Sequence, residues 1–95
     1  MSEQKENSVF IGKRPTMNYV MAAMMLLNEG KNCVIKARGR AISHAVDVAE
    51  ILTKKFVKGS KYKDIRLSTE ELNNPDGRVS NVSSIEIEII PPKTK

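Results

Sequence analysis

The chain passes twice from a strand-like run into a helix-like run, through Gly12-Lys13-Arg14-Pro15 and through Lys36-Ala37-Arg38-Gly39-Arg40. If the two strands are parallel neighbours joined by a crossover helix, both loops lie at the same edge of the sheet. The loop cations then converge with two helix N-termini, which favour anions through free N–H groups and the helix dipole. The sequence therefore predicts an anion-binding edge. No catalytic group stands beside it, so we expect the anion to be bound rather than transformed.

The spacing of apolar and turn residues predicts an α+β fold with the element order β-α-β-α-β-β. Pro15 suits a first helical turn and Gly30 a C-terminal cap, while Asn73-Asn74-Pro75-Asp76-Gly77 is a turn cluster between two final strands. The predicted elements are a strand at 8–12, a helix at 15–30, a strand at 32–37, a helix at 41–58, and strands at 62–72 and 79–90.

Both predicted helices carry apolar stripes. On the first helix, the stripe consists of Met17, Val20, Met21, Met24 and Leu27. We expect this stripe to be core; an adaptable binding groove is the less favoured alternative. The second helix has more apolar surface than one face needs, with Val48 and Ile51 beside its main stripe. That surplus predicts a second contact, most simply with another copy of the chain.

The two final strands change character along their length. The clean alternation of Ile85, Ile87 and Ile89 with glutamates favours burial, whereas residues 70–84 are mostly polar. We therefore predict that residues 70–84 form an arm that projects from the body, with Arg78 near its tip.

Length and composition predict one domain, residues 1–95, with a core at about 8–90 and flexible ends at 1–7 and 91–95. Sixteen Lys and Arg against eleven Asp and Glu give a formal net charge of +5, which favours nucleic acid or an acidic surface as partner. Cys33 is the only cysteine, so we expect a small buried side chain. No apolar run is long enough to span a membrane. We expect a soluble cytoplasmic protein without cofactor or metal.

Four blocks of the chain resemble the signature blocks of the Alba family, the archaeal chromatin proteins. They are GKRPTMNYV at 12–20, IKARGRAIS at 35–43, DGR at 76–78 and VSSIEI at 82–87, and the match runs from about Val9 to Ile89. The resemblance implies a two-layer sandwich of two helices on a mixed four-stranded sheet with a protruding β-hairpin arm. It also implies a homodimer, and non-catalytic binding of double-stranded DNA and of RNA.

The resemblance further implies roles for single residues. Lys13 is expected to face the nucleic acid and to be a target of an acetylation and deacetylation enzyme pair. Phe56 is expected to contact a neighbouring dimer, with core packing as an equal alternative. The arm, with Arg78, is expected to reach toward the minor groove.

The complete set of expected nucleic-acid-binding residues is Lys13, Arg14, Asn18, Tyr19, Lys36, Arg38, Arg40 and Arg78. Packing is an equal alternative for Tyr19, and Lys36 has even odds of pointing to the same edge. His44 is expected at the surface or facing nucleic acid rather than in catalysis. Glu70 and Glu71 depart from the family pattern, since they place negative charge on the arm.

We interpret the chain as a dimeric, largely sequence-independent protein that coats or compacts DNA at the chromosome and also binds RNA, because nothing in it supplies base-specific readout. The alternative is an RNA-binding protein or ribonucleoprotein subunit with the same fold. An enzyme acting on nucleic acid would need a metal or nucleophile constellation, which the sequence does not show.

Overall fold

The computed structural model describes residues 7–92, so most of the two predicted flexible ends, 1–6 and 93–95, lies outside the described residues. The element order confirms the predicted α+β fold. The elements are β1 (Ser8–Phe10), α1 (Thr16–Asn28), β2 (Cys33–Arg38), α2 (Ala41–Ile51), a π-helical turn η2 (Leu52–Phe56), β3 (Lys61–Asn73) and β4 (Val79–Ile90).

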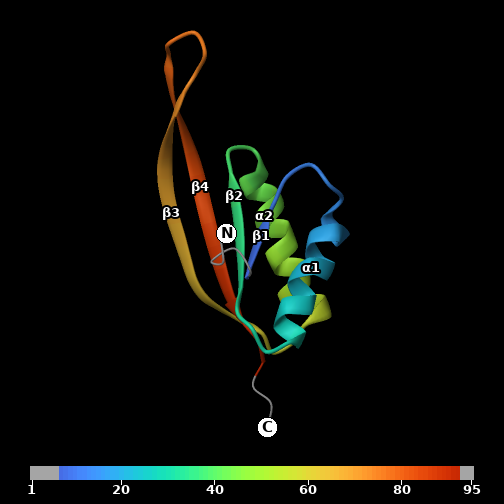
Figure 1. The fold of residues 1–95 in the computed structure, drawn as a ribbon. Helices are drawn as coiled ribbons and strands as arrows, with labels where there is room; N and C mark the ends of the chain where they lie inside the picture. Colours follow the sequence, from blue (N-terminus) through green and yellow to red (C-terminus); the bar gives the residue numbers. More distant parts are fainter. Residues whose placement is uncertain (1–6, 93–95) are drawn as a thin grey trace.

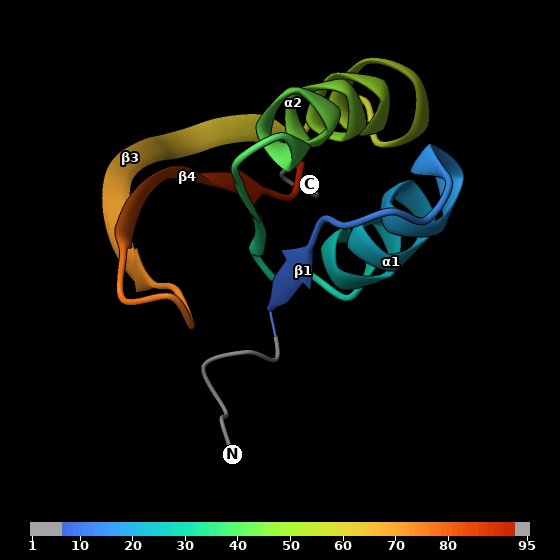
Figure 2. The same ribbon diagram turned by 90° about the horizontal axis from the view of Figure 1, so that it is seen from above.

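The four strands form one mixed sheet in the order β1-β2-β4-β3. β1 and β2 are parallel, while β4 is antiparallel to both β2 and β3. Both helices cover the same face of this sheet, and the other face, called here the open face, carries no helix (Figure 2). The β3–β4 hairpin extends well beyond the rest of the molecule (Figure 1). The whole molecule, hairpin included, measures 55 × 25 × 20 Å.

The core lies between the helices and the sheet. Alternation along β2 and β4 directs one set of side chains toward the helices, because successive strand residues point to opposite faces. The largest fully buried side chains are Ile35, Leu52, Ile89, Val20, Val48 and Cys33. Within residues 7–92, no helix is both long enough and apolar enough to cross a membrane.

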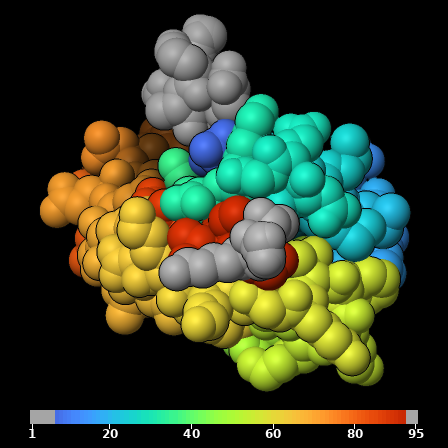
Figure 3. All heavy atoms as spheres, turned by 90° about the horizontal axis from the view of Figure 1, so that it is seen from below, coloured from blue at the N-terminus to red at the C-terminus, as the bar shows by residue number. Residues whose placement is uncertain are grey.

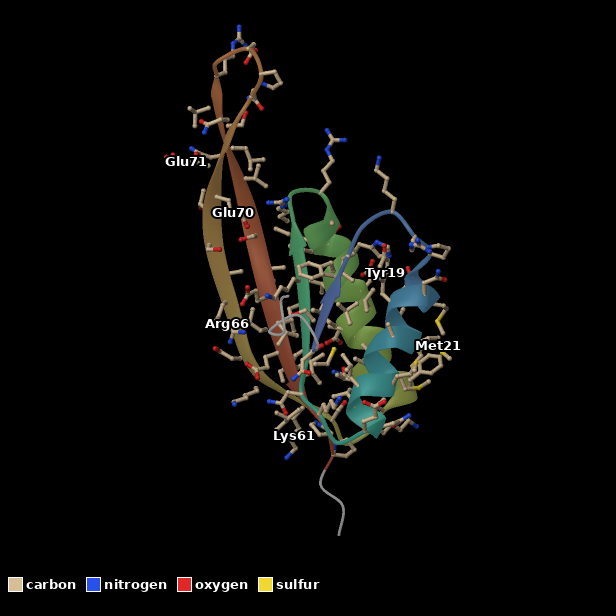
Figure 4. All side chains as sticks on the ribbon, in the orientation of Figure 1. Tyr19, Met21, Lys61, Arg66, Glu70 and Glu71 are labelled. Carbon is tan, nitrogen blue, oxygen red and sulfur yellow. The ribbon has the colours of Figure 1, made fainter. Side chains whose placement is uncertain are left out.

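The inner face of α1 differs from the predicted stripe. It consists of Tyr19, Val20, Ala23 and Leu27. Met24 is partly buried against this core, but Met17 and Met21 are exposed, so the expectation that they belong to the core is wrong. Figure 4 shows Met21 on the side of α1 away from the sheet. The reason is that two adjacent apolar stripes share the helix, and the one with small Ala23 permits the closer packing.

The ends of α1 lie within two residues of the positions predicted from Pro15 and Gly30. Pro15 precedes the helix instead of forming its first turn, and Gly30 adopts a left-handed φ of +81° just beyond it. The Gly30 N–H donates to the Leu27 carbonyl and the Lys31 N–H donates to the Leu26 carbonyl, which is a Schellman motif.

The second helix is shorter than predicted. α2 ends at Ile51, and η2 follows, with the Val57 N–H donating to the Leu52 carbonyl over 2.8 Å. The Thr53 hydroxyl donates to the Ala49 carbonyl at 2.9 Å, and such a bond bends helices. The prediction that Val48 belongs to a surplus of apolar surface left for a second contact is also wrong, because Val48 is fully buried.

Backbone contacts reach both ends of the described range. The Asn7 carbonyl accepts the Val34 N–H at 2.8 Å, and Pro92 lies next to Gly59. Figure 3 shows the end of the molecule opposite the arm, where the last part of β4 emerges between the start of β3 and the segment that joins α1 to β2.

Candidate nucleic-acid interface

The two cationic loops meet at one end of the sheet, as the parallel pairing of β1 and β2 requires. Together they line a hollow of about 330 Å³, called here the loop hollow, whose walls are Gly12, Lys13, Arg38, Arg40, Ala41 and His44. Both loops lie at the end from which the arm projects (Figure 1). Figure 4 shows nitrogen-tipped side chains extending from both loops in the same direction.

Both helices begin at this end without the features that usually satisfy a helix N-terminus. Neither α1 nor α2 has a side-chain cap, and neither has an acidic residue in its first turn. Ser, Thr, Asp or Asn caps normally bind the free amides there. With no side-chain cap and no acidic residue to oppose them, the two helix dipoles add to the positive potential of the loop hollow.

Tyr19 shapes the first loop from inside. Its hydroxyl accepts hydrogen bonds from the backbone N–H groups of Gly12 and Arg14, both at 2.9 Å, and the side chain is only 7 % exposed. Figure 4 shows Tyr19 near the start of α1, beneath that loop. Of the two predicted roles, the structure favours packing: Tyr19 holds the backbone that carries Lys13 and Arg14.

His44 joins the two helices below the loop hollow. Its Nε2 lies 2.9 Å from the Thr16 hydroxyl, and its ring meets the Tyr19 ring edge-on with centroids 5.6 Å apart. These contacts fix the start of α2 against the start of α1. The histidine thus sets the relative position of the two loops while also lining the hollow between them.

Gly39 separates the two arginines of the second loop. Its φ of +62° lies in the left-handed region, which glycine adopts without the usual steric cost. The Gly39 N–H donates to the Ser83 carbonyl of β4 at 2.8 Å. This bond attaches the second loop to the base of the arm and leaves Arg38 and Arg40 on either side.

The four loop cations differ in whether an acidic side chain neutralises their charge. Arg38 donates from Nη1 to the Glu70 carboxylate at 2.6 Å, so one arm residue already neutralises it. Lys13, Arg14 and Arg40 form no ion pair within residues 7–92 and are exposed. Three uncompensated charges around two helix N-termini make this a surface that attracts anions.

Lys36 does not join the other cations. It lies on the open face, where its Nζ is 3.6 Å from the Glu86 carboxylate and 5.6 Å from the centre of the Phe10 ring. It lines a different hollow, of about 490 Å³, on that face. Alternation along β2 places Lys36 and Arg38 on the same side, opposite the buried Ile35 and Ala37, but only Arg38, the last residue of β2, also lines the loop hollow.

The open face is largely self-neutralised by ion pairs around Arg66 (Figure 4). Its guanidinium contacts Asp64 at 2.9 Å, Glu86 at 3.1 Å and Glu88 at 3.3 Å, and these bonds raise the pKa of Arg66. The Asn32 amide donates to Glu88 at 3.0 Å and, with Arg66, lowers the pKa of that carboxyl. Because these charges cancel, the open face attracts phosphate less than the loop hollow does.

The remaining predicted contacts lie on exposed surface. Asn18 is exposed in the first turn of α1. The Arg78 side chain at the arm tip is 84 % exposed, with its Nε 3.6 Å from the Asp76 carboxylate. The arm is held by its own turn, where the Asn74 N–H donates to the Arg78 carbonyl at 2.8 Å. The structure thus groups Lys13, Arg14, Arg38 and Arg40, and sets Arg78 apart on the arm.

Two features of the site escaped sequence reasoning. Thr16 gave no signal as the partner of His44, because the pair is 28 residues apart in the chain. The pairing of Glu70 with Arg38 was also missed, because β4 lies between β2 and β3 and sequence spacing does not show that side chains on these two strands meet across it. Within residues 7–92, no three His, Cys, Asp or Glu side chains lie close enough together to hold a metal ion.

Comparison with known proteins places this architecture in a family. The family model Alba matches residues 7–69. The chain is 56 % identical over 84 residues to the DNA/RNA-binding protein Alba of Thermoplasma volcanium, covering 87 % of this chain and 93 % of that protein. It is 55 % identical over 83 residues to the DNA/RNA-binding protein Alba 1 of Archaeoglobus fulgidus, covering 86 % and 92 %.

Solved structures agree with the sequence comparisons. Alba from Thermoplasma volcanium superposes with a TM-score of 0.82 at 53 % identity, covering 88 % of this chain and 99 % of that chain. ALBA1 from Trypanosoma brucei superposes with a TM-score of 0.72 at 30 % identity, covering 92 % and 70 %. The chain, with its two helices on a mixed four-stranded sheet and its cationic loops at one edge, belongs to the Alba family.

Proposed function

We propose that this protein is a non-catalytic, homodimeric nucleic-acid-binding protein that coats or compacts double-stranded DNA with little regard to sequence and also binds RNA. The relatives named DNA/RNA-binding protein Alba support the nucleic-acid class of ligand. The observation that carries the proposal is the loop hollow, where exposed Lys13, Arg14 and Arg40 surround two uncapped helix N-termini.

Phosphate, not base edges, is the group that this surface recognises. Cations and backbone amides contact the nucleic-acid backbone, which fixes position but carries no sequence information. Neither helix N-terminus projects far enough as a free element to act as a recognition helix, since both pack on the sheet (Figure 2). Affinity should therefore come mainly from phosphate neutralisation and depend steeply on salt.

The experiment is a salt titration of binding to duplex DNA. The double variant Lys13→Ala, Arg14→Ala should weaken binding to all sequences alike. Each lost phosphate contact should lower the slope of log affinity against log salt by about 0.9.

A matched control removes two charges at the other end of the molecule. Lys55→Ala, Lys58→Ala changes net charge equally, but these residues lie beyond α2, away from the loop hollow. It should leave the slope nearly unchanged. If the loop variant keeps the wild-type slope, the loop hollow does not hold phosphate.

A second copy of the chain is the proposed partner of β3. Ile65 is 52 % and Leu67 is 75 % exposed, although their cross-strand neighbours Ile87 and Ile85 are buried. Exposed apolar side chains on a long edge strand are normally covered. Leu67→Lys should convert the homodimer to monomer at micromolar concentration, while Leu72→Lys, on the arm, should not. A wild-type monomer in sedimentation would contradict the dimer.

Phe56 is the proposed contact between neighbouring dimers on DNA. It ends η2 and is 42 % exposed, so it is outside the core of the single chain. Phe56→Ala should leave the dimer intact and reduce the cooperativity of DNA coating, measured as the steepness of the binding isotherm. An unchanged isotherm would argue against this contact.

Lys13 is the proposed modification site. Acetylation by an acetylation and deacetylation enzyme pair would remove its charge from the loop hollow. Lys13→Gln should then weaken binding, and Lys13→Arg should preserve it. The proposed location is the cytoplasm, in association with the chromosome.

RNA is the second candidate ligand, because an A-form duplex presents phosphates and 2′-hydroxyls to the same cationic surface. Competition between duplex DNA and duplex RNA at matched salt ranks the two. A preference of tenfold or more for RNA would favour the ribonucleoprotein role over the chromatin role.

A further inference from the structure

Glu70, a residue of the arm, forms an ion pair with Arg38, a cation of the second loop. Its Oε1 accepts from Arg38 Nη1 at 2.6 Å, joining β3 to the end of β2 across the open face. Both residues line the open-face hollow, and Arg38 also lines the loop hollow. The carboxylate therefore sits on a guanidinium that faces the proposed phosphate site.

We propose that Glu70 is an internal stand-in for a phosphate: it holds Arg38 and the base of the arm in the free protein, and nucleic acid displaces it. This inference rests on the proposed function and adds an autoinhibitory contact to it. Carboxylate and phosphate are the two anions that a guanidinium fork binds in the same geometry. They therefore compete for the same donors of Arg38.

The pair is suited to exchange because it is accessible. The side chains of Arg38 and Glu70 are 58 % and 43 % exposed, so water screens their attraction. Exposed pairs of this kind are weak, whereas a nucleic-acid phosphate arrives with its neighbours already bound by Lys13, Arg14 and Arg40. The contact thus lowers affinity by a limited factor without blocking binding.

Adjacent Glu71 shows that geometry, not charge alone, makes this contact. Successive residues of a strand point to opposite faces, so Glu70 points toward the body and Glu71 away from it (Figure 4). Glu71 makes no ion pair within residues 7–92. The two glutamates carry the same charge at almost the same place, and only one of them competes.

Displacement would also change the arm. The second loop contacts the base of the arm through the backbone, by the pairing of Arg38 with Ser84 and the bond from Gly39 to Ser83, and through the Arg38–Glu70 ion pair. Loss of the ion pair leaves the backbone contacts to β4 but removes the side-chain contact to β3. The arm is then freer to follow the nucleic acid, so binding at the loops and movement of the arm are coupled.

The test compares Glu70→Gln with the matched control Glu71→Gln in titrations with duplex DNA at low salt. Both remove one negative charge, so both relieve general repulsion equally. Only Glu70→Gln removes the competitor, and it should bind about 1.5- to 5-fold more tightly than Glu71→Gln, the range expected for an exposed ion pair. Equal affinities for the two variants would overturn the proposal.

A double-mutant cycle separates competition from repulsion. In an Arg38→Gln background, Glu70 has no guanidinium to occupy, so Glu70→Gln should lose its advantage over Glu71→Gln. If the advantage persists there, Glu70 acts on the nucleic acid from a distance and the competitor role is wrong. Wild-type protein that fails to bind DNA would refute the proposed function itself, whereas normal wild-type binding with no effect of Glu70→Gln refutes this inference alone.

Discussion

Tyr19→Phe isolates the contribution of one hydroxyl to the binding loop. The substitution keeps the buried ring and its edge-on contact with His44, but removes the acceptor for the backbone N–H groups of Gly12 and Arg14. The two amides then turn to solvent. We therefore expect a looser loop on an otherwise intact core.

The magnitude follows from the two bonds. Each hydrogen bond contributes about 0.5–1.5 kcal/mol net, and the loop amides are near the surface, where water replaces the lost acceptor. The free energy of unfolding should therefore fall by about 1–2 kcal/mol. If the loop must reorder before it binds, affinity for duplex DNA should fall by a similar free energy, about five- to thirtyfold.

Three measurements check this: urea unfolding, amide exchange at Gly12 and Arg14, and DNA titration. Tyr62→Phe is the matched control, since the Tyr62 hydroxyl donates to Glu50 at the far end of the molecule. It should leave both loop amides protected and DNA affinity unchanged.

The reasoning would be refuted if Tyr19→Phe weakened DNA binding while unfolding and amide exchange stayed as in the wild type. Tyr19 would then contact the nucleic acid directly instead of ordering the loop.

Three further changes probe the body of the protein. Burial raises the pKa of the Cys33 thiol to about 12. At pH 8 a thiol reagent should therefore modify the native protein on the order of a thousandfold more slowly than the urea-unfolded chain. Comparable rates would show that the core is open. The pKa of Glu88 is lower in the folded protein than its ordinary value of 4.5, so its contribution to stability is complete above pH 4.5 and is lost as pH falls through the lower folded value. Glu88→Gln should therefore lower the free energy of unfolding by about 1 kcal/mol at pH 7, and by less at pH 3, as measured by urea unfolding. Gly39→Ala should cost about 1–2 kcal/mol because of its left-handed φ, and an unchanged unfolding midpoint would mean that the second loop relaxes at no cost.

The element order and the position of the loops were predictable because they depend on local patterns. The turn cluster at 73–77 and the alternation that ends the strand at 85–89 gave the bounds of β4, and the positions of Pro15 and Gly30 bracketed α1 to within two residues. The crossover rule placed both loops at one edge without any knowledge of side-chain packing.

Other features depended on packing between distant residues and could not be read from spacing. The sequence of α1 contains two adjacent apolar stripes, and only the packing against the sheet shows which one is buried and that Met17 and Met21 are exposed. The change from α2 to the π-helical turn η2 was not predicted, because the bond from the Thr53 hydroxyl to the Ala49 carbonyl that accompanies it leaves no signal in the spacing of apolar residues. Alternation with Ile35 fixes the side of the sheet on which Lys36 lies, but whether its side chain reaches the loop cations or pairs with Glu86 depends on the neighbouring strand β4.

The arm has a consequence for how this protein can vary. Its residue pairs, from Thr69–Ser83 to Asn73–Val79, are almost all solvent-exposed, and its register is set by hydrogen bonds within the turn at Asn74 and Gly77. A substitution on its surface therefore changes charge or shape at the tip without disturbing the buried layer between helices and sheet. The surface of the arm and the stability of the body are thus separable, and the arm can accumulate sequence change that the remainder of the chain would not tolerate.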